Sequence, residues 1–322
     1  MSETGGGGNE RRGVTGVAPS GPVGDAPGAP PLDDVGTRPQ PQPLSRTARF
    51  AWGAVIVILI GVVTLVIYAF TVPSTQSLVT PSPTPPSVVA ALAHVSPSTF
   101  NAVGAQVTAK PTPLTPPRIL VGQPRLELGG KPEVLFVGAD YCPFCAAERW
   151  PLIVALSRFG RFSGLHDTQS AGSSVFAGIQ TFSFQNVQLE SPYLSFVGVE
   201  LYSDELNPNS TYVRIASLTP EQSALVDRYG GAASRSTTPI PFFDVANRMV
   251  ATTSAFSPGL LTRQSQADLV ASLDMPQRAA GQAIVAAANQ LSAGLCLVTG
   301  QQPASVCTSK GVRAAAASLG IS

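Results

Sequence analysis

The hydrophobic pattern begins with a polar stretch and then a long apolar run. Residues 1–49 carry almost no large apolar side chains, and glycine and proline runs interrupt them. Too little apolar surface is present to offset the entropy of ordering, so we predict a disordered tail. Residues 50–72 are 23 consecutive uncharged and mostly apolar positions (FAWGAVIVILIGVVTLVIYAFTV). A helix of that length rises about 34 Å, enough to cross a hydrocarbon core of about 30 Å.

The charges around this run indicate its orientation in a membrane. Arg46 and Arg49 precede it, and the first charged residue after it is Lys110. The positive-inside rule therefore predicts a cytoplasmic N-terminus, a single span through the lipid bilayer of the cell membrane, and an extracytoplasmic remainder. A cleaved signal peptide would have a shorter apolar region close to the start of the chain.

The remainder predicts an α/β domain behind a linker. Residues 73–86 are rich in Pro, Ser and Thr, which is typical of an extended linker. Residues 87–322 form the domain, with a core over about 125–275 and a C-terminal helical hairpin over about 276–320. The core pattern predicts strands at 131–138, 173–189 and 195–202, helices at 142–159 and 219–229, and a hairpin of strands at 241–245 and 249–251. Alternation of this kind favours an α/β fold.

A C-x-x-C motif, Cys142-Pro143-Phe144-Cys145, lies where the first predicted strand gives way to a helix. The unpaired N–H groups of a helix start favour an anion, which lowers the pKa of a thiol placed there. Two intervening residues bring the sulfurs within bonding distance. We therefore predict Cys142 as the exposed catalytic nucleophile and Cys145 as the thiol that resolves the mixed disulfide.

Two other interpretations of this motif stay open. The pair is also compatible with a permanent structural disulfide. It is compatible with half of a metal site for copper(I) or zinc as well, although no second ligand pair of matching spacing accompanies it.

Two prolines open the late strand, in Thr238-Pro239-Ile240-Pro241. The family resemblance given below implies a cis proline that presents the preceding backbone to the substrate beside the C-x-x-C motif. Cis bonds occur almost only before proline. We predict that Ile240 and Pro241 orient the substrate, because Phe242 and Phe243 follow directly; Pro239 is the alternative.

The run GKPEVLFVGADYCPFCAAERWPLIVALSRFGRFSGL, over residues 130–165, resembles the thioredoxin superfamily. More narrowly, it resembles the membrane-anchored family called domain of unknown function 929. The resemblance continues through 191–196, 238–244 and the Cys296 to Cys307 tail. It implies a thioredoxin-like fold, an extracytoplasmic C-x-x-C pair and thiol–disulfide chemistry.

One position departs from ordinary thioredoxins. Many of them carry a buried carboxylate six residues before the first cysteine, where this chain has Phe136. Asp140 and Glu148 are the nearest possible substitutes, although we expect each to be solvated or salt-bridged.

The remaining cysteines, Cys296 and Cys307, bracket a turn between two predicted helices. Thiols outside the cytoplasm tend to be oxidised. We predict a structural disulfide there, with a second redox pair as the alternative. Four cysteines allow three pairings, and the sequence does not choose among them.

Composition narrows the function further. The net charge is +1 and only 12% of residues are charged, which argues against nucleic-acid binding. The sequence contains no phosphate-binding or zinc-protease motif, and we expect no cofactor. The predicted function is thiol–disulfide oxidoreduction on extracytoplasmic protein thiols and disulfides, with a possible membrane redox partner. The alternative is a non-catalytic thioredoxin-like binding or scaffold module.

Overall fold

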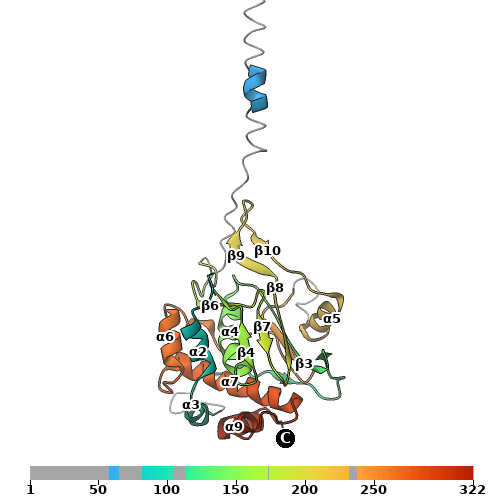
Figure 1. Ribbon diagram of the computed structural model, residues 1–322, viewed down its shortest axis with the longest axis vertical. Coiled ribbons are helices and arrows are strands. Elements are labelled where there is room, and N and C mark those ends of the chain that lie inside the picture. The colour runs from blue at the N-terminus through green and yellow to red at the C-terminus, as the bar shows by residue number, and fades with distance from the viewer. Residues whose placement is uncertain (1–57, 65–81, 105–112, 173, 232–237, 322) are drawn as a thin grey trace, which may run out of the picture. The chain divides into compact units, whose positions relative to one another are not determined.

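The structure is a computed structural model that describes residues 58–64, 82–104, 113–172, 174–231 and 238–321 (Figure 1). The chain divides into two compact units, residues 1–76 and 77–322. In the first unit, residues 58–64 are helical, and the apolar side chains of Ile58 and Ile60 are 65% and 60% exposed. The predicted tail and the other residues of the predicted span lie outside the described residues.

The second unit is built around a mixed six-stranded sheet in which β3 (Lys131–Gly138) pairs with three other strands. Strand β3 pairs in parallel with β8 (Ser195–Glu200) and antiparallel with β11 (Phe242–Val245). The sheet continues from β11 through β12 (Met249–Ala251) to β1 (Arg118–Ile119), and β2 (Glu127–Leu128) pairs with the first residues of β3.

The apolar run of β3 is buried on both faces, as expected for a central strand. Val134 and Phe136 pack into the larger core, which includes α4 (Pro143–Leu156) and α7 (Ala279–Val298). Leu135 and Val137 point to the other face and pack with residues of α5 (Pro220–Tyr229). The sheet is thus covered by helices on both faces, which Figure 1 shows as α4 and α7 on one side and α5 on the other. These observations confirm a mixed α/β domain.

Three pairs of short strands and further helices complete the unit. The strand pairs are β4 (Arg161–Ser163) with β7 (Gln188–Glu190), β5 (His166–Gln169) with β6 (Gln180–Ser183), and β9 (Tyr202–Leu206) with β10 (Tyr212–Arg214). The helices are α2 (Pro86–Ala93), α3 (Pro97–Val103), the 3-10 helix η2 (Pro258–Leu260), α6 (Gln266–Ser272), α8 (Ala304–Cys307) and α9 (Lys310–Ser318).

Several predicted boundaries differ from the structure. The strand predicted at 173–189 is wrong: β6 and β7 are separated by a turn in which Asn186 has a φ of 59°. The strand predicted at 195–202 ends at Glu200, and Tyr202 begins β9, which pairs with β10 instead of the central sheet. Residues 82–86, assigned to the linker, contact the domain, because the Thr84 N–H donates to Leu165 and its hydroxyl donates to Asp167.

Helix α7 is the one described helix that is long and apolar enough to cross a membrane, but its apolar window is 94% buried within the domain. It packs along α4, and Gly281 permits its first turn to approach the backbone of Ser272, where a Cβ would lie 1.9 Å from the carbonyl oxygen. The apolar composition of α7 is therefore explained by its place in the core.

The predicted disulfide is present. Cys296, in the last turn of α7, is bonded to Cys307 at the end of α8. Both residues are buried, at 2% and 4% exposure. The bond fixes the chain reversal after α7 and so positions α9.

Removing this bond should destabilise the domain. The residues are 11 positions apart, so the double variant Cys296→Ala, Cys307→Ala should lose about 3 kcal/mol of unfolding free energy through chain entropy. Urea denaturation of the full chain in detergent measures this loss. Wild-type protein under reducing conditions should match the variant, and an unchanged free energy would contradict a stabilising role.

Candidate active site

The C-x-x-C motif lies at the start of α4. Cys142 is the N-cap, and its sulfur accepts a hydrogen bond from the backbone N–H of Cys145 at 3.1 Å. Pro143 follows within the first turn, where its missing N–H has no consequence for the helix. The sulfur of Cys142 therefore sits where the free N–H groups and the helix dipole favour negative charge.

The two thiols differ in acidity. The pKa of Cys142 is lowered, first by a hydrogen bond with the Cys145 side chain and further by backbone N–H groups and the charge of Arg149, although burial opposes the shift. The pKa of Cys145 is raised well above its ordinary value, because it is fully buried and interacts with Cys142. Cys142 is thus the thiol that ionises first, as predicted for the nucleophile.

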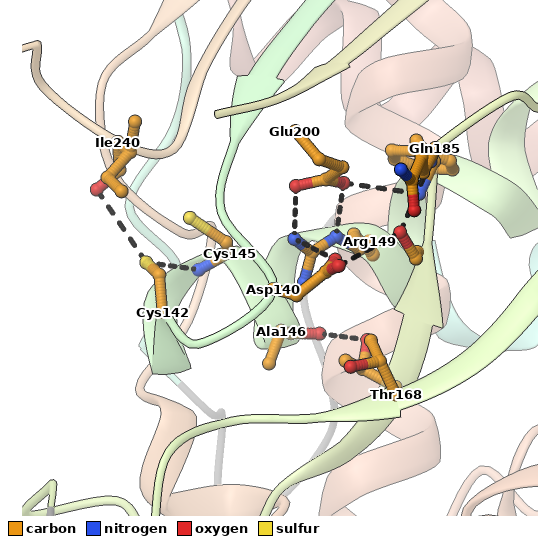
Figure 2. A network of polar contacts seen from close by, with 12 residues as sticks. Asp140, Cys142, Cys145, Ala146, Arg149, Thr168, Gln185, Glu200 and Ile240 are labelled. Carbon is orange, nitrogen blue, oxygen red and sulfur yellow. Dashed lines mark hydrogen bonds and ion pairs between the residues drawn. The ribbon is translucent and has the colours of Figure 1, made fainter. Parts of the chain in front are cut away.

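The exposure predicted for Cys142 is wrong. Cys142 is only 5% exposed and Cys145 is 0% exposed, whereas Phe144 between them is 40% exposed. The reason is that the sulfur of Cys142 points inward, toward the Cys145 N–H and the carbonyl oxygen of Ile240, as Figure 2 shows.

The segment before β11 lies next to this sulfur. The Ile240 carbonyl oxygen is 4.0 Å from the Cys142 Sγ, and the peptide bond between Ile240 and Pro241 is cis. The bond before Pro239 is not among the cis bonds of the described residues. The structure thus brings together all four residues predicted for the site: Cys142, Cys145, Ile240 and Pro241. The role of the last two in orienting substrate stays a prediction.

A buried ionic cluster lies one turn beyond Cys145. The Arg149 guanidinium donates to both carboxylate oxygens of Glu200, at 2.9 and 2.6 Å, and reaches Asp140 at 3.4 Å. All three side chains are at most 8% exposed. The Ser183 hydroxyl donates to Asp140, and the N–H of Phe184 donates to Glu200. Figure 2 shows this cluster, which ties α4 to β8 and β6.

The charges in the cluster act on one another. Burial and the neighbouring Glu200 raise the pKa of Asp140 to about 7, although Arg149 and the Ser183 hydroxyl lower it. Burial disfavours the charge on Arg149, but the two carboxylates outweigh that effect and hold its pKa above the ordinary value. Asp140 is therefore salt-bridged, as expected.

Contrary to expectation, Glu148 is not solvated, and it has no ion-pair partner in the part of the chain that the structure describes. It is fully buried, and its Oε2 accepts a hydrogen bond from the N–H of Ala255 at 2.7 Å. Its Oε1 has no hydrogen-bond partner among the described residues. Glu148 and Gln290 both line a small cavity. Burial raises the pKa of Glu148 to about 8, so this side chain is mostly uncharged at neutral pH.

Aromatic side chains flank the motif on both sides. Tyr141 stacks on Tyr212 of β10 with ring centroids 4.0 Å apart. Phe144 meets the edge of Phe176 at 6.0 Å. Phe144 is also the most exposed residue of the motif. The surface around Cys142 is therefore apolar and aromatic.

A family model described as "Domain of unknown function (DUF929)" matches residues 120–297. The chain belongs to the DUF929 family. This confirms the family resemblance drawn from the sequence, and the matched segment contains every residue of the site described above. Comparison with curated proteins and with solved structures finds no match.

Two residues of the DUF929 site were missed in the sequence. The sequence did not identify Arg149 as a site residue, because the helix around it is mostly apolar. The available signal was its spacing: a residue four positions after Cys145 lies on the same face of a helix. Glu200 was also missed, because it is the last residue of a mostly apolar strand and no nearby residue in the sequence indicates a partner for it. Cys296 and Cys307 are bonded to each other and belong to a different part of the core. No cluster of three or more potential metal ligands occurs within the described ranges.

The acidity of Cys142 can be measured in the reduced DUF929 protein. Because its pKa is lowered, thiolate absorbance near 240 nm should appear on titration at a lower pH than for free cysteine, whose pKa is about 8.5. Cys142→Ser should lose this early step, whereas Cys145→Ser should retain a thiolate. A single step near the free-cysteine pKa in all three proteins would contradict the assignment.

Glu148 should make stability depend on pH. The folded protein holds its proton up to about pH 8, whereas the unfolded chain releases it near pH 4.3. The folded state thus binds more protons between these values, and its stability falls as pH rises through that window. Glu148→Gln removes this effect, so the variant should gain stability relative to wild type from about pH 4.5 to 8.

Urea denaturation at a series of pH values tests this expectation. Glu205→Gln, at an exposed position on β9, is the matched control and should follow wild type throughout. A constant difference between Glu148→Gln and wild type would show that Glu148 is ionised in the folded state.

Proposed function

We propose that the protein is a membrane-anchored thiol–disulfide oxidoreductase that acts on extracytoplasmic protein thiols and disulfides. The observation that carries this proposal is the placement of Cys142 as the N-cap of α4, with its sulfur accepting the Cys145 N–H. A thiolate stabilised in this way is the reactive species in disulfide exchange.

The topology around the motif supports a thioredoxin-like fold. Strands β3 and β8 are parallel neighbours, and the connection between them contains α4. A C-x-x-C pair near a βαβ unit is typical of a thioredoxin-like redox site. The cis Ile240–Pro241 bond lies beside Cys142, as the resemblance implies for a substrate-orienting proline.

The proposed reaction has two exchange steps. The Cys142 thiolate attacks one sulfur of a substrate disulfide, and the second substrate sulfur leaves as a thiolate. Cys145 then attacks the Cys142 sulfur, releases the first substrate sulfur and closes the Cys142–Cys145 disulfide. The substrate disulfide gains two electrons and the protein dithiol loses them. The reverse sequence oxidises a substrate dithiol.

The proposed location follows from the sequence. The apolar run at 50–72 anchors the chain in the cell membrane, with the domain on the extracytoplasmic side. In that position the site meets secreted and membrane proteins, and a membrane redox partner could restore its redox state. Labelling of Cys142 by a membrane-impermeant thiol reagent, compared between intact and lysed cells, tests this orientation. An extracytoplasmic domain should be labelled equally in both, whereas a cytoplasmic domain would be labelled only after lysis.

The scaffold alternative has one observation in its favour, which is the 5% exposure of Cys142. A permanently bonded Cys142–Cys145 pair inside a binding module would need no access to substrate. The reduction potential distinguishes the two functions. An inert bridge lies below about −300 mV, and the oxidoreductase is expected above that value.

Trapping of substrates provides the direct test. In Cys145→Ser the first exchange step proceeds but resolution does not, so mixed disulfides with substrate proteins should accumulate on non-reducing gels. The double variant Cys142→Ser, Cys145→Ser is the control and should trap nothing. Cys142→Ser should also reduce the rate of model protein disulfide reduction to background. A well-expressed Cys145→Ser protein without mixed disulfides would support the scaffold.

A further inference from the structure

Two buried oxygen atoms on neighbouring helices have no hydrogen-bond partner among the described residues. They are the Oε1 atoms of Glu148 on α4 and of Gln290 on α7. The two side chains are 0% and 5% exposed, so bulk water does not reach them. A buried acceptor without a donor is destabilising, and proteins pair nearly all such atoms with protein groups or with ordered water.

Glu148 and Gln290 line the same small cavity, which lies between α4, α7 and the chain that follows β12. The volume open to the centre of a water molecule is about 10 Å³. By this measure, one buried water needs at least about 10–15 Å³. The cavity therefore has room for a single water and for nothing larger. The other lining residues include Thr115, Thr253, Phe243, Ala287 and Leu291.

The two unpaired oxygens both need a donor. The other carboxyl oxygen of Glu148, Oε2, already accepts the N–H of Ala255 at 2.7 Å. None of the described residues that line the cavity is basic, so no charged side chain supplies a donor there. A cavity lined only by apolar groups stays dry, whereas one with two or more polar partners binds water. A water molecule has two donor hydrogens and also accepts, so it fits this pair of oxygens.

We propose that the Oε1 atoms of Glu148 and Gln290 face this cavity and that the cavity binds one water molecule, which bridges them. In the uncharged form of Glu148, the proton lies on Oε1, because Oε2 accepts the Ala255 N–H. The carboxyl group then donates to the water, and the water donates to the Gln290 carbonyl oxygen. In the ionised form, the water donates one hydrogen to each side chain.

The bridge would hold the helix that carries the two thiols on a second side. Glu148 lies three residues after Cys145 on α4, and its neighbour Arg149 turns toward Glu200 of β8. The water would connect the same part of α4 to the middle of α7. This inference does not depend on the proposed function, because it holds whether or not Cys142 exchanges disulfides.

Two other arrangements of the same residues are the outcomes that would overturn the proposal. In the first, the cavity is dry and both oxygens stay unpaired. In the second, the carboxyl group of Glu148 donates directly to Gln290 and no water lies between them. A stability measurement identifies the dry cavity, and a count of internal waters identifies both arrangements.

The stability measurement uses Gln290→Met, which nearly conserves volume and removes one polar partner. Leu295→Met, at a position on α7 that is 2% exposed and does not line the cavity, is the matched control for a methionine in this core. Urea denaturation of the full chain in detergent at pH 7 gives the ratio of folded to unfolded protein. With the bridge, this ratio should fall in Gln290→Met about fivefold further than in the control. With a dry cavity, the substitution removes an unpaired polar group and the ratio should rise, which would overturn the proposal.

The count of internal waters uses oxygen-17 magnetic relaxation dispersion, which detects water molecules that stay bound inside a protein. The double variant Glu148→Met, Gln290→Met makes the two bridging positions apolar, so it should hold one long-lived water fewer than wild type in the same detergent. An equal count in the two proteins would overturn the proposal.

A crystal structure of the wild-type full chain provides the same decision if the double variant does not fold. Density for one water should lie within hydrogen-bond distance, about 2.7–3.2 Å, of both Oε1 atoms. The absence of that density, or direct contact between the two oxygens, would overturn the proposal.

Discussion

The burial of one arginine constrains the whole site. A guanidinium cannot stay in a protein core without partners, and removing a partner from such a pair costs several kcal/mol. Arg149 meets this requirement with a bidentate contact to Glu200, a second carboxylate from Asp140 and the face of Phe136 at 5.6 Å. These partners come from β8, β3 and the turn before α4. The helix that carries both thiols is thereby fixed against the centre of the sheet.

This constraint accounts for the unequal environments of the two cysteines. Cys142 ends the turn between β3 and α4, where backbone N–H groups converge on its sulfur. Cys145 lies one turn further in, without exposed surface and above the charged cluster. One short segment therefore holds a thiol that ionises readily and a thiol that resists ionisation. The two thiols differ in acidity because of their positions in α4. Cys142 is at the N-cap, where backbone N–H groups are free, whereas Cys145 is one turn later, where fewer N–H groups are free and no water has access.

Features governed by local sequence were predicted well. The apolar strand at 131–138, the helix at 219–229 and the hairpin of strands at 241–245 and 249–251 were predicted, and they correspond to β3, α5 and the β11–β12 pair. Features that depend on distant partners were not. The inward orientation of Cys142 requires the Ile240 carbonyl, 98 residues away. The role of Arg149 requires Glu200, 51 residues away, and neither residue signals the other in the sequence.

The position of Phe136 illustrates why a family motif is insufficient to assign the chemistry. Considered alone, Phe136 indicates that the chain lacks the buried carboxylate that many thioredoxins have at this position, which would favour the scaffold alternative. The structure shows that Phe136 covers a guanidinium whose two carboxylates lie on the neighbouring β8 strand and in the turn that leads to Cys142. An aromatic ring at that point excludes water from the pair and so strengthens its electrostatic interactions. In this chain the buried carboxylates near the motif are therefore Asp140 and Glu200, and Phe136 packs on the arginine that binds them. The apolar residue at position 136 does not by itself argue against disulfide exchange at Cys145.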